Sequence, residues 1–224
     1  KDLEAYNKLL EAFIQIGKAR TTDSNHRFKK YQDLTKDIRL SEAEELWVGD
    51  ITYISTKDGF YYLSTLMDAY TKYILGYHLS KDLSSKGCEE TLKMALANKL
   101  YNNETMHHTD RGMQYCCIDY VKILKRNKIK ISMTENGSPY ENAMAERLNE
   151  TLKVELGLEH VFEAYNDSNK VVKEAIRIYN YRRPHLSCGY LTPREAHLQG
   201  FGLINLWKNR SNKGIHAFVH PCTS

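Results

Sequence analysis

The chain has 224 residues, enough for one well-buried core and a small additional module at either end. Hydrophobic residues make up 42% and charged residues 27%, the balance of an ordinary globular protein, and no stretch approaches the roughly 18 consecutive apolar residues of a membrane span. The net charge of +4 permits an anionic partner without requiring one. Because the sequence begins at Lys1 and shows no secretory signal pattern, we expect a cytoplasmic piece of a longer chain with no membrane association.

The first forty residues predict a helix followed by a linker. Residues 1–17 carry a rough apolar stripe at helical spacing, and residues 18–41 are polar and broken. We therefore assign residues 1–40 to an N-terminal helix and a basic linker, 41–200 to a core domain, and 201–224 to a C-terminal tail without recognisable chemistry.

The middle of the chain predicts an α/β fold. Three segments rich in β-branched and aromatic residues are separated by short breaks, one of them containing Asp58-Gly59, which is typical of a hairpin. Helical and strand patterns then alternate. The predicted strands are 46–56, 59–68, 71–80, 105–109 and 130–133, and the predicted helices are 84–100, 115–126, a long one from about 141, and 167–181. This order predicts a mixed five-stranded sheet, with three antiparallel strands and then two parallel ones, flanked by helices.

Asp50 is unusual because both faces of its strand consist of apolar and aromatic residues. Such a strand is expected at the centre of the sheet, where a lone carboxylate is costly and needs a cationic partner. An aspartate at a strand kink that bonds local backbone is an equally good reading of Asp50 alone.

Asp110 and Glu146 are ordinary when each is taken alone. Asp110 directly follows a short strand, where ligands bind in open α/β sheets, although a turn aspartate before Gly112 is the commoner case. Glu146 belongs to a polar helix stripe with Asn142, Asn149 and Lys153, which is more often a solvated face.

Together the three carboxylates indicate a metal site. Asp50 and Asp110 are separated by 59 residues, and Asp110 and Glu146 by 35. A central strand, the end of its neighbour and a covering helix can bring them to one point. Carboxylate oxygens without histidine or thiolate suit Mg²⁺ or Mn²⁺, and two such ions support in-line phosphoryl transfer.

Three segments carrying these residues resemble a known family. WVGDITYI, HTDRGMQY and NAMAERLNETLKVE are similar to the three blocks of the integrase core in OrfB-type transposases of the bacterial IS-three family, relatives of retroviral integrases. The likeness extends through YNYRRPHLSCGYLTPREA, so it covers roughly residues 20–198. Glu141 departs from the family, which usually has aspartate there, but keeps the acidic character.

The resemblance implies an RNase H-like fold and metal-dependent cleavage and strand transfer at transposon ends. It assigns two Mg²⁺ or Mn²⁺ ions to Asp50, Asp110 and Glu146, and places Lys153 against the transposon-end DNA. It also implies DNA as partner, a homo-oligomer on that DNA, an upstream DNA-binding region, and a location in the bacterial cytoplasm with the nucleoid. Further candidate DNA contacts are Asn142, Asn149, Arg111, Tyr140, Arg182 and Arg183.

Several readings stay open at this point. A nuclease or resolvase of the same fold that uses water alone, and a decayed transposase that only binds DNA, would share these motifs. The basic run over residues 122–130 is either a solvated face or a DNA contact. His107 and His108 alternate along a strand and are expected in structural roles. The five cysteines, odd in number and without C-x-x-C spacing, are expected to be reduced structural thiols.

Overall fold

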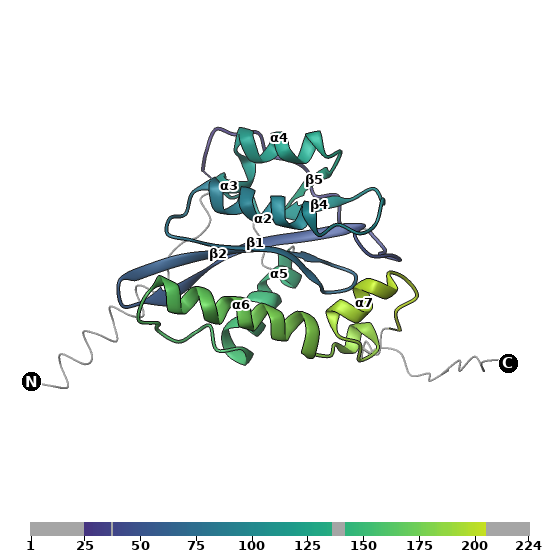
Figure 1. Cartoon of the computed structure of the whole chain (residues 1–224). Helices are drawn as coiled ribbons and strands as arrows, with labels where there is room; N and C mark the ends of the chain where they lie inside the picture. The colour runs from purple at the N-terminus through teal and green to yellow at the C-terminus, as the bar shows by residue number, and fades with distance from the viewer. Residues whose placement is uncertain (1–24, 37, 136–141, 205–224) are drawn as a thin grey trace, which may run out of the picture.

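A computed structural model describes residues 25–36, 38–135 and 142–204 of the chain. At its centre is one five-stranded sheet in the spatial order β3-β2-β1-β4-β5 (Figure 1). Strands β1 to β3 pair antiparallel, whereas β4 runs parallel to β1 and β5 parallel to β4. The predicted mixed sheet is therefore confirmed. The strands are β1 Leu46–Thr56, β2 Gly59–Asp68, β3 Ile74–Ser80, β4 Met106–Thr109 and β5 Lys130–Met133.

Helices cover both faces of the sheet. On one side lie α2 Ser85–Ala97, α3 Met113–Cys116 and α4 Ile118–Arg126 (Figure 1). On the other lie α5 Ala143–Glu150, α6 Tyr165–Arg182 and α7 Pro193–Gln199. Two short turns complete this side, a π-helical turn over Thr151–Glu155 and a 3₁₀ turn over Leu186–Cys188.

The alternation of strand β1 explains the two cores. Leu46, Val48 and Ile54 pack toward α5 and α6, while Trp47 and Ile51 pack toward α2 and α4. All five are buried, so β1 is the central, two-sided strand that the sequence predicted. Since side chains alternate along a strand, Asp50 shares its face with Val48 and points toward α5.

Two helices depart from their predicted form. The segment predicted as one helix over 115–126 consists of α3 and α4, separated by Cys117 in extended conformation, whose Sγ accepts from Tyr120 N. The long helix predicted from about residue 141 is α-helical only to Glu150 and then widens into the π-helical turn, in which Leu156 N donates to Thr151 O. Residues 1–17, the predicted N-terminal helix, lie outside the described residues.

The described part of the predicted linker lies against the core. Met133 N donates to Gln32 O at 3.2 Å, and Leu34 N donates to the buried Ser132 Oγ at 2.9 Å. Phe28, Tyr31, Ile38 and Leu40 pack on the two apolar clusters. This segment therefore runs along the β5 edge of the sheet. A domain boundary at residue 40 stays a prediction.

Helix α7 is anchored by a buried polar cluster. Thr192 and Glu195 form the predicted capping box, with Pro193 at the first helical position. One turn later, the fully buried His197 lies 3.1 Å from Glu44 and 3.7 Å from Asp68. These contacts tie the end of the described chain to β2 and to the turn before β1. Among the described helices, none is both long and apolar enough to cross a membrane.

Candidate active site

The parallel register of β1 and β4 places two aspartates side by side. Residues Leu46–Val48 pair with Met106–His108 in order, so each β1 residue faces the residue numbered 60 higher. Continuing this register by two residues puts Asp50 opposite Asp110. Neighbouring strands lie about 4.8 Å apart. Strand β4 ends at Thr109 while β1 continues to Thr56, so both carboxylates stand where the sheet opens.

Two glycines allow this close approach. A Cβ on Gly49 would lie 3.0 Å from the His107 ring and 3.4 Å from Thr109 Cγ2, so a side chain there would push β4 away. Gly112 N donates to Asp110 Oδ1 at 2.9 Å, and a Cβ on Gly112 would lie 2.9 Å from the same oxygen. The Asp110 carboxylate is thus held by a backbone N–H that only glycine can bring so near.

Helix α5 brings Glu146 to this opening and is tied to β1 by two asparagines. Asn149 Nδ2 donates to Asp50 Oδ2 at 2.7 Å, and Asn142 Nδ2 donates to Gly49 O at 3.2 Å. Both asparagines are buried, and within the described residues the Oδ1 atom of each has no hydrogen-bond partner. Glu146, Asn149 and Lys153 of the predicted stripe therefore line the groove beside Asp50, while Asn142 lies beside Gly49. The two asparagines contact protein in this structure, so contact between them and DNA stays a prediction.

The carboxylates influence one another electrostatically. The pKa of Asp50 is raised to about 7, first by burial and then by the nearby charges of Asp110 and Glu146, while hydrogen bonds from the N–H of Ile51 and the amide of Asn149 oppose the rise. Burial also raises the pKa of Glu146. A carboxylate with such a raised pKa gains from any cation that neutralises the cluster.

Lys153 lies on the same groove as Asp50 and Glu146. The three residues line a cavity of about 430 Å³ together with Tyr53 and Asn149. Lys153 Nζ stands 3.8 Å from the centre of the Tyr53 ring, a cation–π contact. Burial lowers the pKa of Lys153, while the charge of Asp50 opposes that shift. Because Lys153 belongs to the π-helical turn, its spacing from Glu146 is not that of two regular α-helical turns, although it still lines the site.

The donor set suits a hard divalent cation, but its side chains are not gathered into a ligand shell. Within residues 25–36, 38–135 and 142–204, no group of three or more His, Cys, Asp or Glu side chains is arranged so that it could hold a metal ion. The charges of Asp110 and Glu146 act on Asp50, and the buried Oδ1 of Asn149, which lines the groove with Asp50 and Glu146, has no hydrogen-bond donor among the described residues. Acceptor oxygens of this kind fit Mg²⁺ or Mn²⁺ and its bound water.

The remaining residues that were predicted to contact DNA belong to separate parts of the chain. Arg111 Nη1 donates to Glu135 O at 2.6 Å, which ties it to the end of β5. Arg183 pairs with Glu155 through two contacts of 2.7 and 2.8 Å, so its charge is compensated within the protein. Arg182 is exposed, and Tyr140 lies outside the described residues. DNA contacts by these four residues stay predictions.

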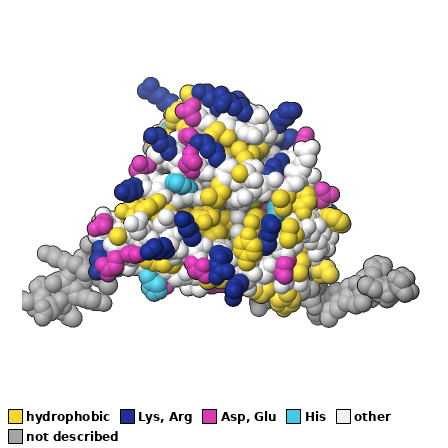
Figure 2. Space-filling model, in the orientation of Figure 1, with side chains coloured by type: hydrophobic (Ala, Val, Ile, Leu, Met, Phe, Trp, Pro, Cys, Tyr) yellow, Lys and Arg dark blue, Asp and Glu magenta, His cyan; other side chains and the backbone are white. Residues whose placement is uncertain are grey.

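The basic run follows α4, on the face of the sheet opposite α5. Figure 2 shows Lys and Arg side chains gathered over α4, at the top of the view. Lys122, Lys125, Arg126 and Lys128 are exposed there. Lys122 pairs with Asp119, and Lys130 pairs with Glu104. The solvated-face reading is therefore the simpler one for at least part of this run.

His107 and His108 have the predicted structural roles. His107 Nε2 lies 2.7 Å from Tyr120 OH, and burial lowers the pKa of His107 to about 4. His108 Nδ1 lies 2.8 Å from Ser132 Oγ. The four described cysteines, Cys88, Cys116, Cys117 and Cys188, are free thiols, as expected, and three of them are buried.

Two features of the site were not predicted from the sequence. The sequence contained one hint of the hydrogen bond from Asn149 to Asp50, because Asn142 and Asn149 share a helix stripe with Glu146. The sequence contained no hint of the hydrogen bond between Gly112 and Asp110, because Asp-x-Gly segments are common in ordinary turns.

This architecture defines the class of protein as an RNase H-like domain of the kind found in retroviral integrases. The chain superposes with a TM-score of 0.61 and 17% identity on a chain of the simian T-cell lymphotropic virus intasome bound to a PP2A regulatory subunit, covering 92% of this chain and 68% of that one. The HTLV-2 integrase catalytic core in complex with magnesium gives a TM-score of 0.53 at 19% identity, covering 69% and 96% respectively. At such identities the likeness concerns the fold.

The sequence places the chain in its family. Two models described as "Integrase core domain" match residues 41–139 and 127–193. A 31 kDa protein of insertion element IS600 from Shigella sonnei is 35% identical over 77% of this chain and 64% of its own length. Transposase InsF of insertion sequence IS3A from Escherichia coli is 34% identical over 72% of this chain and 57% of its own length. The chain belongs to the integrase core family, and it spans about three fifths of the length of these curated relatives.

Proposed function

We propose that this chain is the catalytic domain of a DNA transposase, which cleaves and joins DNA strands at transposon ends with Asp50, Asp110 and Glu146 as its catalytic residues. The proposal is supported by the β1–β4 register, which continues to Asp50 and Asp110 where β4 ends, and by the groove that Asp50, Glu146 and Lys153 line together. The relation to insertion-sequence transposases supports DNA as the substrate.

The three carboxylates would hold two Mg²⁺ or Mn²⁺ ions. When bound, the ions supply activation of the attacking oxygen and stabilisation of the leaving oxygen in an in-line displacement at phosphorus. The support for this pair of ions is the donor chemistry and the raised pKa of Asp50, which comes first from burial and then from the charges of Asp110 and Glu146; a divalent cation would offset both.

The chain's own groups prepare the carboxylates. The amide of Asn149 orients Asp50, and the N–H of Gly112 orients Asp110. On the wall of the same groove, Lys153 provides a positive charge for a DNA phosphate beside the carboxylates. One site of this kind serves both strand cleavage by water and joining by a 3′ hydroxyl, because only the nucleophile differs.

Recognition of the transposon ends would come from an upstream module, with residues 1–40 as its tail. Because a transposon has two ends, we propose that the active form is a homo-oligomer assembled on DNA at the bacterial nucleoid. This part of the proposal rests on the family alone.

The test separates catalysis from end recognition. The full chain is incubated with Mg²⁺ or Mn²⁺ and either a labelled transposon-end duplex or a branched DNA that already contains the joined strands. By microscopic reversibility, the branched substrate needs only the catalytic site. We expect a strand-transfer product from the first and resolved strands from the second. Cleavage without any joined product would instead identify a nuclease that uses water alone.

The variants Asp50→Asn, Asp110→Asn and Glu146→Gln should abolish both reactions while thermal unfolding stays close to wild type. Glu90→Gln, an exposed change on the opposite face of the sheet, is the matched control. Normal turnover by any of the three site variants would refute the assignment of these residues, and no reaction on either DNA with wild-type protein would refute the catalytic proposal.

A further inference from the structure

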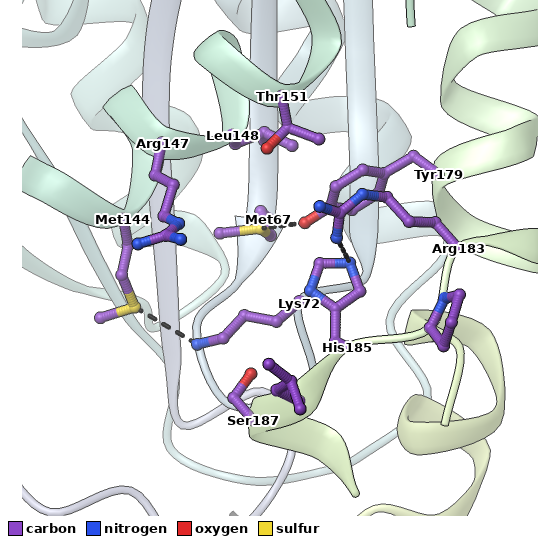
Figure 3. Close-up of a pocket in the computed structure, with 12 residues that line it drawn as sticks. Met67, Lys72, Met144, Arg147, Leu148, Thr151, Tyr179, Arg183, His185 and Ser187 are labelled. Carbon is purple, nitrogen blue, oxygen red and sulfur yellow. Dashed lines mark hydrogen bonds between the residues drawn. The ribbon is translucent and has the colours of Figure 1, made fainter. Parts of the chain in front are cut away.

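A second cavity lies on the other side of helix α5. It has a volume of about 310 Å³ and is closed in by α5, the end of α6, the 3₁₀ turn and the turn between β2 and β3 (Figure 3). Met144, Arg147 and Leu148 reach it from one face of α5, and Thr151 reaches it from the start of the π-helical turn that follows. Glu146, Asn149 and Lys153 line the active-site groove instead. The two cavities therefore share a helix but no lining residue.

Three cations from separate elements surround this cavity, which we call the Lys72 pocket. Lys72, Arg147 and Arg183 belong to the β2–β3 turn, α5 and the end of α6 respectively (Figure 3). Its walls are apolar where Met67, Leu148 and Tyr179 line it. An apolar wall beneath several cations favours an anionic ligand, because the charges are poorly screened by water there.

The described residues that line the pocket include three cations and no carboxylate. Arg183 is neutralised by its two contacts with Glu155 and donates to His185 Nε2 at 3.1 Å. Burial lowers the pKa of His185 to about 4, helped by the charges of Arg183 and Lys72, so this imidazole is neutral at physiological pH. His185 therefore adds no charge to the three cations of the lining.

Lys72 is held in place at a conformational cost and with few partners. Its φ of 66° is in the left-handed region, which residues other than glycine and asparagine rarely adopt. Its ammonium group donates to Ala69 O and to the weak acceptor Met144 Sδ, the latter at 3.5 Å. Burial lowers the pKa of Lys72, while Cys188 and the charge of Asp68 oppose that shift, as an anion in the pocket also would.

We propose that the Lys72 pocket binds a phosphate group. Lys72 and Arg147 would supply the charge, and the Ser187 hydroxyl, which also lines the pocket, a neutral donor. The volume lies at the lower end of the range of ligand pockets and is large enough for a nucleotide that carries the phosphate, with its sugar against the apolar wall. That the phosphate belongs to a DNA strand terminus rests on the proposed function; phosphate binding itself does not.

Methionine methyl NMR tests the pocket directly. Met67 and Met144 line it, whereas Met94 and Met113 lie on the other face of the sheet and serve as internal references. The full chain labelled at its methionine methyl groups is titrated with inorganic phosphate, with a 5′-phosphorylated oligonucleotide and with the same oligonucleotide ending in a 5′ hydroxyl. Sodium chloride at matched ionic strength is the blank.

We expect saturable shifts of Met67 and Met144 with phosphate and with the phosphorylated oligonucleotide, and none with the blank. Shifts with inorganic phosphate but equal behaviour of the two oligonucleotides would overturn the 5′ terminus of a DNA strand as the source and retain the phosphate site. Unmoved Met67 and Met144 signals, or equal shifts of all methionines, would overturn the pocket. None of these results depends on catalysis, so the proposed function is judged separately.

Two variants test whether Lys72 and Arg147 bind the phosphate. Arg147→Gln changes an exposed helix residue, and Lys72→Asn replaces the cation by a residue that tolerates a positive φ, so both should fold. Each should weaken phosphate binding by about tenfold, the effect of one charge-assisted hydrogen bond. Lys125→Gln on α4 removes one cation from the opposite face and should leave the binding unchanged. Equal affinity in all three variants would exclude Lys72 and Arg147 as the phosphate ligands.

Discussion

Substituting Gly112 by alanine tests how strictly the Asp110 carboxylate is held. The backbone of Gly112 has φ −58° and ψ 144°, which alanine adopts without strain. The added Cβ, however, would lie 2.9 Å from Asp110 Oδ1 and 3.0 Å from Gln114 Oε1. Ordinary contacts to a Cβ begin near 3.4 Å, so one or both neighbours must move by a few tenths of an ångström. The hydrogen bond from Gly112 N to Asp110 Oδ1 is then lost or distorted.

The expected effect is large on catalysis and small on stability. Losing a hydrogen bond to a charged group lowers the free energy of unfolding by about 1.5–3 kcal/mol. Replacing glycine by alanine at a compatible backbone position raises it by about 0.4–1 kcal/mol, because the unfolded chain then has less conformational freedom. The net loss of stability is therefore about 0.5–2.6 kcal/mol. Misplacing a catalytic group by up to about 1 Å lowers the rate by up to about a hundredfold. We expect the resolution rate on the branched DNA to fall about tenfold to a hundredfold.

Three measurements decide this prediction. Urea unfolding gives the free energy of unfolding, Mn²⁺ titration gives the metal affinity, and the branched-DNA assay gives the rate. The variant Asp110→Asn keeps the shape of the side chain but removes its charge, and it gives the reference value for complete loss of the reaction. Gly112→Ala with wild-type Mn²⁺ affinity and wild-type rate would show that Asp110 is not positioned by this contact and would refute the reasoning.

Three further predictions concern other parts of the molecule. Asn149→Leu, similar in volume but without the donor to Asp50 Oδ2, should lower the rate and the Mn²⁺ affinity about tenfold or more while the fold is kept; unchanged Mn²⁺ affinity would argue against a positioning role. Lys153→Ala should weaken DNA binding and reduce the slope of log affinity against log salt by about one, and an unchanged slope would remove Lys153 from the phosphate contacts. Although burial lowers the pKa of His197, its hydrogen bonds with Asp68 and Glu44 raise it above the ordinary 6.5. The protonated form therefore stabilises the fold fully below pH about 6.5, and this contribution is lost as the pH rises through the folded pKa. The unfolding free energy of wild type minus that of His197→Gln should accordingly decline from pH 6 to pH 9, and a flat difference would contradict the pKa direction.

The sheet and the three carboxylates could be predicted because both follow from short-range patterns in the sequence. Period-two alternation and the Asp58-Gly59 hairpin identify the antiparallel strands, and the order of elements then leaves few arrangements for β4 and β5. Asp50 stood out because its strand is apolar on both faces. The register that sets it opposite Asp110 follows only once β1 and β4 are known to pair.

The remaining features depend on contacts that no local pattern records. The π-helical turn at Thr151–Glu155 arises in a segment whose sequence reads as a regular helix, and the segment around Gln32 binds the β5 edge mainly through its backbone. Whether three carboxylates close around an ion depends on their rotamers and on charge, which the spacing in the sequence does not specify. The Lys72 pocket brings together residues 72, 147 and 183, each of which reads alone as a surface cation.

The position of α5 links these features. The helix is fixed to β1 by Asn142 and Asn149 on one face, and its neighbouring face borders the Lys72 pocket through Arg147. Glu146 and Arg147 are consecutive, so a ligand that moves Arg147 acts on the backbone that carries Glu146. If phosphate binding in the pocket shifts α5, the Mn²⁺ affinity of the active site must change with phosphate concentration, and by linkage the phosphate affinity must change by the same factor with Mn²⁺. Measuring both factors on the wild-type chain shows whether the two cavities are coupled, and equal affinities with and without the second ligand would show that they act independently.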